Sequence, residues 1–369
     1  MYKLNIPQQV IFGWDSLPKL NSLLPDVERL LIVSGRSAQN SGLIDELLKL
    51  LAPRQIKCFC EVDPEPSIQQ LDAVRQIFRD FQAQAVVAVG GGSALDVGKL
   101  TAAAAYSTLP TAEFFYNRAL LPEKGCFMAA LPTTAGTGAE VTPNGVFTDI
   151  TTGIKQSIRG GTVLPSLALV DPALTVNCPP GISAASGLDA LTQGIESYIS
   201  ANANNATRPW AAQGVKLINN AIEQVWQDGQ DRAARSDMSE GTMLGAMAFA
   251  VSGLGAVHGL AHPLGAKLHL PHGLICGILL PTVLKWNMPV CRKQLDDLAQ
   301  YCNYKNGADL IERIEFLLDK FNIQRSLQTY GLQTADLEWI VKNSRSGSMR
   351  ANPRQLSDSE LTQLLMESF

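Results

Sequence analysis

The sequence predicts an α/β fold with a parallel sheet in its N-terminal half and an all-α C-terminal half. Short apolar runs alternate with amphipathic segments up to about residue 171. Beyond the stretch CPPGISAASG, at 178–187, only helical patterns follow. A chain of 369 residues also exceeds one ordinary core. We therefore expect two domains, residues 1–179 and 180–369.

The expected strands of the first domain are five apolar runs. Buried parallel strands have continuous apolar sequences, because helices cover both faces of their sheet. The runs are RLLIV (29–33), IKCFCEV (56–62), AVVAVG (85–90), FMAALP (127–132) and SLALVD (166–171). Helical segments at 41–51 and 67–81 lie between them. This alternation is typical of a parallel sheet with helices on both sides.

The expected helices of the second domain begin after Pro179, Pro180 and Gly181, which should break the chain. Helical patterns occupy 187–200, 207–226, 239–251, 309–321 and 357–369. The longest uncharged run, 241–257, is rich in Gly and Ala and indicates a packed core helix rather than a membrane span. The cleft between the two domains is the default place for a ligand.

Composition excludes several classes of function. The net charge is −4 and the basic residues are scattered, which argues against a nucleic-acid groove and a membrane-surface patch. The N-terminal MYKLNIPQQV lacks the apolar run of a signal peptide. The seven cysteines are odd in number and have no CxxC spacing, so we expect free thiols and a cytoplasmic protein.

A glycine-rich loop is the strongest signal in the first half. In AVVAVGGGSALDVGKL an apolar strand enters Gly90-Gly91-Gly92-Ser93 and a helix follows at once. Glycines let the backbone approach a ligand, and the free N–H groups of a helix start favour a phosphate there. Ser93 is the expected N-cap. A P-loop is excluded because Ser93, not Gly, stands five residues before Gly98, and no GxGxxG follows the first expected strand.

A second polar loop, LPTTAGTGAEVTPNG at 131–145, also follows a strand. It offers hydroxyl groups and bare backbone to a sugar-phosphate ligand, although such a loop can also be only a connection.

All four histidines lie within residues 257–273, VHGLAHPLGAKLHLPHG. His258 and His262 are four apart and share a helix face, whereas His272 begins another element after Pro271. We interpret His269 as a surface or packing residue. With Asp189, two imidazoles would form an Fe²⁺ or Zn²⁺ site. Taken alone, each histidine could equally be a hydrogen-bonded core residue rather than a metal ligand.

The ordered set of motifs resembles the iron-containing (group III) alcohol dehydrogenase family. The motifs are GGGSALDVGK, PTTAGTGAEVT, GLDALTQGIESYIS, VHGLAHPLGAKLHLPHG and NPR at 352–354. This family is related in fold to glycerol dehydrogenase and dehydroquinate synthase. The resemblance runs nearly end to end, and is strongest to short-chain primary alcohol, lactaldehyde or propanol dehydrogenases. It implies a dinucleotide-binding N-terminal domain and a helical metal-binding C-terminal domain.

The resemblance also implies roles for individual residues. Asp189, His258 and His272 would hold the metal, and His262 would lie beside the nicotinamide as the catalytic proton relay. The residues that would bind the nucleotide are Gly91, Gly92, Ser93, Asp96, Thr133, Thr134, Thr142, Asn144 and Lys155.

Gln193 departs from the family pattern GxDALxHxxE, in which the histidine is a fourth metal ligand. A Gln oxygen is a weaker ligand than imidazole. Three readings follow: three strong ligands and a weak fourth still bind metal, the protein is purified without metal, or the enzyme is a metal-independent reductase.

Gly35 and Arg36 bear on the choice of cofactor. The family often has Asp at the position of Gly35, where it binds the adenosine ribose and repels a 2′-phosphate. The loss of that carboxylate and the adjacent guanidinium favour NADP(H) over NAD(H), unless Arg36 points into solvent.

The predicted function is therefore an NAD(P)-dependent alcohol dehydrogenase or aldehyde reductase with metal-assisted hydride transfer to or from a small primary alcohol or aldehyde. A lyase of the dehydroquinate synthase type is disfavoured, because only Lys267 lies near the histidines. A degenerate, non-catalytic nucleotide-binding protein is the remaining alternative. A homodimer or larger homo-oligomer is the default expectation from the family.

Overall fold

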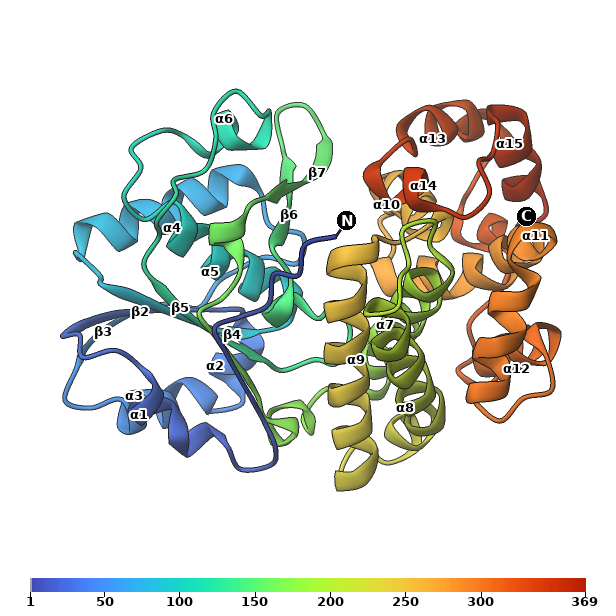
Figure 1. The fold of residues 1–369 in the computed structure, drawn as a ribbon. Coiled ribbons are helices and arrows are strands. Elements are labelled where there is room, and N and C mark those ends of the chain that lie inside the picture. The colour runs from blue at the N-terminus through green and yellow to red at the C-terminus, as the bar shows by residue number, and fades with distance from the viewer. Residues whose placement is uncertain (1) are drawn as a thin grey trace. The chain divides into compact units, whose positions relative to one another are not determined.

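The computed structural model describes residues 2–369, which form two compact units: one is Leu4–Cys178, and the other is Pro179–Phe369 together with residues 2–3 (Figure 1). Each unit has its own secondary-structure class. The first contains a parallel sheet with helices, and the second is helical throughout its described residues. The expected fold class is confirmed.

The sheet of the first unit has six parallel strands in the order β1-β8-β5-β4-β2-β3. The strands are β1 (Gln9–Phe12), β2 (Arg29–Ser34), β3 (Gln55–Phe59), β4 (Ala85–Gly90), β5 (Phe127–Pro132) and β8 (Leu167–Val170). All five apolar runs form strands of this sheet. The register pairs Leu31 with both Lys57 and Val86, so β2 is fully interior.

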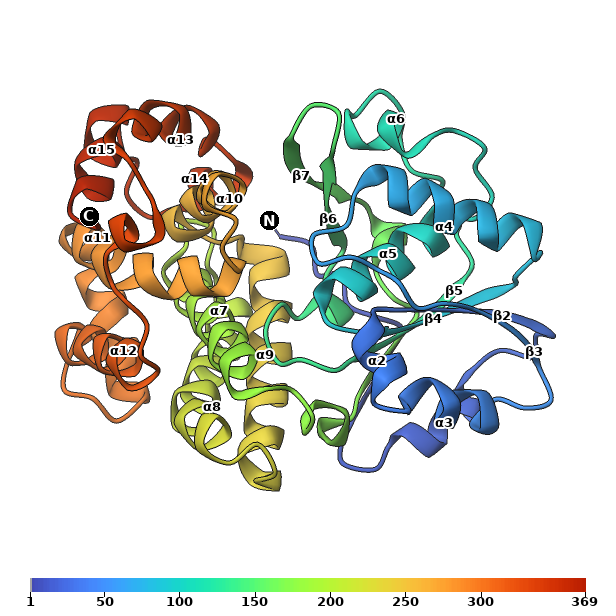
Figure 2. The same cartoon turned by 180° about the vertical axis from the view of Figure 1, so that it is seen from behind.

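Both faces of the sheet are buried, as the apolar sequences require. Leu31 and Val33 enter one core, and Leu30 and Ile32 enter the other, because side chains alternate along a strand. Figures 1 and 2 show α4 and α5 on one face and α1 to α3 on the other. The helices are α1 (Leu20–Leu23), α2 (Arg36–Asn40), α3 (Leu43–Leu50), α4 (Ile68–Asp80), α5 (Gly92–Ala103) and α6 (Thr111–Phe115).

The direction of winding reverses at β2. From β2 the chain crosses to β3 on one side, and then returns to β4 on the other side. Ligands of open α/β sheets bind beyond the carboxyl ends of the strands at such a reversal. The loops that begin at Gly35 and Gly91 leave the sheet at this point.

Three strands of the structure were not predicted from the sequence, because no apolar run marks them. β1 is an edge strand that is only partly buried. β6 (Asn144–Asp149) and β7 (Ile154–Arg159) form an antiparallel hairpin outside the main sheet. The glycine loop therefore follows the fourth strand of the chain, not the third.

The second unit is built from α7 (Pro180–Ile199), α8 (Thr207–Gln227), α9 (Arg232–Ser252), α10 (Ala256–Leu268), α11 (His272–Tyr301), α12 (Gly307–Lys320), α13 (Leu337–Asn343), α14 (Gly347–Ala351) and α15 (Asp358–Met366). The expectation that Pro180 and Gly181 break the chain is wrong, because Pro180 is the first residue of α7, where its missing N–H costs nothing.

The uncharged run 241–257 is not one helix. α9 ends at Ser252 and α10 begins at Ala256, with a bend of 101° between them. Gly253 has φ +73°, which a side chain would disfavour. Among the described residues, α11 is the one helix that is by itself long and apolar enough to cross a membrane, but it is kinked at Cys291 and 61% of its apolar window is buried within the protein. It is a core helix of its unit, packed against α7, α10 and α12.

Candidate metal centre and nucleotide loop

Close packing of α11 against α7 creates the centre of the second unit. A Cβ at Gly273 would lie 2.1 Å from the carbonyl oxygen of Ala185, and one at Gly277 would lie 2.8 Å from Leu188. Glycine at both positions therefore lets the two helices approach more closely than side chains allow. The start of α11, with His272, is thereby held against Asp189 on α7.

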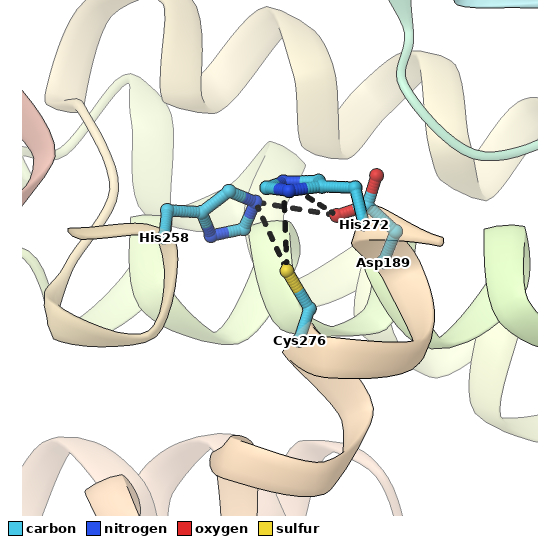
Figure 3. Close-up of side chains that lie close together, drawn as sticks. All are labelled: Asp189, His258, His272 and Cys276. Carbon is cyan, nitrogen blue, oxygen red and sulfur yellow. Dashed lines mark hydrogen bonds and ion pairs between the residues drawn. The ribbon is translucent and has the colours of Figure 1, made fainter. Parts of the chain in front are cut away.

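Four side chains from three helices point toward one another (Figure 3). The Nε2 atom of His258 lies 3.2 Å from Oδ1 of Asp189, and Nε2 of His272 lies 4.0 Å from that oxygen. The Sγ atom of Cys276 lies 3.6 Å from Nε2 of His272 and 4.0 Å from Nε2 of His258. All four donor atoms lie within 4.8 Å of one another.

These separations fit a small divalent cation. Bond lengths of about 2.0–2.1 Å for N and O and about 2.3 Å for S place tetrahedral donor atoms roughly 3.3–3.7 Å apart. The measured distances scatter around that range. Three of the donors, Asp189, His258 and Cys276, are buried, and His272 is partly exposed, which leaves one side open to a ligand.

Glu196 fixes the orientation of His258. One carboxylate oxygen, Oε2, lies 2.7 Å from Nδ1 of His258, so Nε2 faces the cluster. The other, Oε1, accepts a hydrogen bond from the backbone N–H of Val257 at 2.7 Å. A carboxylate behind a ligating imidazole is the usual support of a metal-binding histidine.

The start of α10 is held by a second side chain. Asn352, the first residue of the NPR motif, accepts a hydrogen bond from the N–H of Ala256 at 3.1 Å. Its amide also exchanges hydrogen bonds with Asn287 of α11. A Cβ at Gly255 would lie 2.6 Å from Glu196, so glycine is required where the chain turns into α10. The motif thus positions the histidine-bearing helix.

The electrostatics of the cluster favour positive charge. Burial raises the pKa of Asp189, but the hydrogen bond from His258 and the proximity of His272 outweigh it and lower that pKa overall. Burial opposes protonation of His258, yet Cys276, Asp189 and Glu196 hold its pKa well above the ordinary value. The buried acceptors therefore attract a cation or, without one, a proton.

The other histidines lie where their sequence positions suggest. His262 is one turn after His258 on α10, and its ring stacks on that of His272 with centroids 5.0 Å apart. His269 is exposed at the end of α10, in the left-handed conformation.

Gln193 lies one turn after Asp189 on α7 and is buried. Its Oε1 atom has no hydrogen-bond partner among the described residues. Such an acceptor is costly unless a ligand satisfies it. Cys276 was not predicted from the sequence, although its spacing of four from His272 on one helix was a usable signal.

The glycine loop of the first unit lies at the carboxyl edge of the sheet, packed between the loops that follow β2 and β5. Gly90 has φ +149° and lies against the backbone of Gly35. A Cβ at Gly92 would lie 2.8 Å from the side chain of Thr137, and the N–H of Thr133 donates to the carbonyl of Gly90 at 2.9 Å. The two polar loops are thus neighbours.

The helix start differs from the expectation in one respect. Gly91, not Ser93, is the N-cap of α5, and it provides no side-chain hydrogen bond. Ser93 lies in the first turn, where its hydroxyl accepts from the N–H of Glu65 at 3.3 Å. The first N–H groups of α5 therefore have no side-chain cap and remain available to an anion.

Comparison with known families identifies the family of the chain. The model "Iron-containing alcohol dehydrogenase" matches residues 7–172, and the model "Fe-containing alcohol dehydrogenase family, C-terminal" matches residues 183–369. The chain belongs to the iron-containing alcohol dehydrogenase family. The resemblance inferred from its motifs is confirmed.

Relatives of the family cover almost the entire chain. Alcohol dehydrogenase 4 of Saccharomyces cerevisiae is 31% identical over 99% of this chain and 97% of its own length. The NADPH-dependent butanol dehydrogenase of Clostridium saccharobutylicum is 30% identical over 99% and 97%. The solved structure of a 1,3-propanediol oxidoreductase is 29% identical, with a TM-score of 0.93 and full coverage of both chains.

Membership makes the chain an oxidoreductase, an alcohol dehydrogenase, and implies a nicotinamide cofactor and a divalent metal ion. The residues present fit both groups. The convergence of Asp189, His258, His272 and Cys276 beside the unsatisfied Gln193 suits a cation. The start of α5, which has no side-chain cap and lies in the run of three glycines, suits a phosphate.

The buried residue Lys99 links several of the residues that were expected to bind the cofactor. Its ammonium pairs with Asp96 at 2.9 Å, lies 3.4 Å from the hydroxyl of Thr142, and donates to the carbonyl of Asn144. Asp96 also accepts from the N–H of Val146 at 2.8 Å. Asp96 and Thr142 thereby fix the path of the second loop into β6.

The remaining expected residues lie around the same edge. Lys155 of β7 pairs with Glu65 at 2.6 Å, and Glu65 in turn contacts Ser93. The hydroxyl of Thr134 lies 3.4 Å from a Cβ built on Gly91. Arg36, at the start of α2, is exposed and forms no ion pair with any described residue.

Proposed function

We propose that this family member interconverts short primary alcohols and aldehydes with NADP(H), using a cation held by Asp189, His258 and His272. The convergence of these three side chains from α7, α10 and α11 carries the proposal. Gln193 lies one turn from Asp189 as an additional weak donor. The retained cluster gives no support to a metal-independent or non-catalytic member.

The chemistry is divided between the bound groups and the chain. A divalent cation would supply Lewis-acid polarisation of the alcohol or aldehyde oxygen, and the nicotinamide would accept or donate the hydride. His262, stacked on His272, takes the hydroxyl proton during alcohol oxidation and returns it during aldehyde reduction. Its partial exposure allows the proton to reach solvent.

The cofactor contacts divide into two groups. We propose that the backbone of Gly91 and Gly92 and the hydroxyl of Ser93 bind the pyrophosphate at the start of α5. Thr133, Thr134, Asn144 and Lys155 contact the rest of the nucleotide. Asp96 and Thr142 position these loops through Lys99 rather than touching the cofactor.

The preference for NADP(H) rests on Gly35 and Arg36. Gly35 places no carboxylate at the end of β2 to repel a 2′-phosphate, and the free guanidinium of Arg36 is available to bind one. The name of the NADPH-dependent relative from Clostridium saccharobutylicum supports the same choice.

The names of two relatives, a butanol dehydrogenase and a 1,3-propanediol dehydrogenase, support a short-chain substrate, whereas that of a third, a long-chain-alcohol dehydrogenase, does not. The seven free cysteines are consistent with our proposal of a cytoplasmic enzyme, and a homodimer stays the expectation from the family.

A substrate panel tests the proposal. NADPH and NADH oxidation are measured with aldehydes from two to eight carbons, and the reverse reaction with the matching alcohols, before and after loading with Fe²⁺ or Zn²⁺. We expect metal-dependent turnover with NADPH on the short aldehydes. Absence of turnover under every condition, with cofactor binding intact, would favour the non-catalytic alternative.

A further inference from the structure

We infer that Cys276 is a thiolate ligand of the metal. It takes the place of the family's fourth histidine ligand, whose position is occupied by Gln193 in this chain, and it makes the centre select Zn²⁺ over Fe²⁺. The inference rests on the proposed function only in taking Asp189, His258 and His272 as the other ligands.

Geometry places Cys276 in the ligand set. It lies one turn after His272 on α11, on the same helix face, and is fully buried. Figure 3 shows its sulfur directed at the gap between the two imidazoles and Asp189. Its distance of 3.6 Å from Nε2 of His272 matches the roughly 3.6 Å expected between N and S in a tetrahedral site.

Hydrogen bonding alone does not explain this placement. A thiol is a weak donor, and imidazole nitrogens 3.6 and 4.0 Å away are at the limit of contact for sulfur. The neighbouring groups are the carboxylate of Asp189 and the two imidazoles, all metal-ligating types. On metal binding the thiol releases its proton to solvent and the sulfur forms the bond to the cation.

The donor set determines the choice of metal. Thiolate is a soft ligand that favours Zn²⁺, whereas a site of carboxylate and imidazole alone also suits iron. Gln193 offers only a neutral amide oxygen, so the sulfur restores the strong fourth ligand from a different helix. The loss of histidine on α7 is thus compensated on α11.

Cobalt substitution tests the ligand directly. The purified protein is stripped with a chelator and titrated with Co²⁺, which reports sulfur ligation by a thiolate-to-metal charge-transfer band in the near ultraviolet. We expect this band in the wild type and its loss in Cys276→Ser and Cys276→Ala. Cys291→Ala, which removes another buried thiol of α11, should keep the band.

Metal competition tests selectivity. Wild-type protein dialysed anaerobically against equal Zn²⁺ and Fe²⁺ should retain zinc, and Cys276→Ser should shift the bound ratio toward iron by about tenfold or more. If the Cys276 variants do not fold, zinc-edge X-ray absorption of the wild type decides, since a sulfur scatterer at about 2.3 Å is required.

The outcomes separate this inference from the proposed function. Cobalt bound without a charge-transfer band, or zinc without a sulfur neighbour, overturns the role of Cys276 even if the enzyme oxidises alcohols. A band that depends on Cys276 supports it even if no alcohol in the panel is turned over.

Discussion

At the scale of single residues, Glu196 combines two tasks in one carboxylate. One oxygen holds the imidazole of His258, and the other accepts the backbone N–H of Val257 in the first turn of α10. The backbone start of the helix and the direction of its histidine are therefore set by the same rigid group. Replacing this carboxylate by an amide would disturb His258, the proposed metal ligand, while the amide could still cap the helix.

Glu196→Gln should weaken metal binding by about 10- to 100-fold. The amide oxygen can keep the bond from Val257, which turns the NH₂ group toward Nδ1 of His258. The imidazole must then carry its proton on Nε2, the atom that faces the metal. Zinc affinity is measured by competition with a chromophoric chelator.

Glu312→Gln, an exposed acid of α12, is the matched control and should leave the affinity unchanged. Unaltered zinc binding in Glu196→Gln would show that the carboxylate does not orient the ligand.

Arg36→Ala should raise KM for NADPH roughly tenfold, the value of one charge-assisted hydrogen bond. KM for NADH should change little, because that cofactor has no 2′-phosphate, and it serves as the internal control. Steady-state kinetics with both cofactors check this. Equal changes in both constants would place Arg36 outside the cofactor contacts.

The resemblance to the family predicted that Asp189, His258 and His272 would come together, but it did not reveal Cys276. A cysteine within the apolar sequence of α11 resembles a core residue, and before the helix packing was known only its spacing of four from His272 distinguished it. Ser93 was misassigned as N-cap because three glycines precede it, and any of them could begin the helix.

At the scale of elements, the approach of α11 to α7 depends on Gly273. Replacement by Ala would put its Cβ 2.1 Å from the carbonyl of Ala185, so the helices must separate. We expect Gly273→Ala to destabilise the protein by about 3 kcal/mol or more and to abolish tight metal binding. Thermal unfolding and metal content are the measurements.

Gly181→Ala is the control within α7, where a Cβ meets no atom within 4 Å. It should be neutral or stabilise the helix by up to about 1 kcal/mol. If both variants behave alike, the close approach at Gly273 is not what holds the centre together.

Apolar runs predicted five strands, and β2, β4, β5 and β8 are buried, because burial on both faces leaves a strong signal. The expectation that the fifth, β3, is buried is wrong, because it is a partly exposed edge strand. The hairpin β6–β7 was not predicted, because its strands carry many polar residues and lie outside the main sheet. The break between α9 and α10 was not predicted, because the Gly- and Ala-rich sequence continues on both sides of Gly253.

At the scale of the whole molecule, the first unit carries a buried acid that makes its stability depend on pH. Burial raises the pKa of Glu140 to about 7, against the opposing effects of its own backbone hydrogen bond and of Lys99. Between about pH 4.5 and 7 the unfolded chain ionises Glu140 while the folded unit does not. Stability is therefore complete below that range and falls through it by about 3 kcal/mol.

Glu140→Gln should remove this loss, so the variant should equal the wild type at pH 4 and unfold at a higher temperature at pH 8. Calorimetric Tm values at the two pH values measure the effect. Glu123→Gln, an exposed acid of the same unit, should keep the wild-type slope. A slope unchanged in Glu140→Gln would assign the pH dependence to other groups.

The fold class followed from sequence, but the strand order did not. Nothing in the apolar run of β2 indicates that β3 lies on one side and β4 on the other. The order depends on how the connecting helices pack, which involves residues distant in the chain. The reversal that locates the nucleotide loop was therefore visible only in the structure.

Because the proposed cation ligands come from α7, α10 and α11, an ion bound there would act as a reversible cross-link between segments remote in the chain. At one hundred times its Kd, it would add about 2.7 kcal/mol to the folded state of its unit. Resistance to proteolysis should accordingly follow the supply of the metal, so that starvation for it shortens the lifetime of the enzyme as well as its activity.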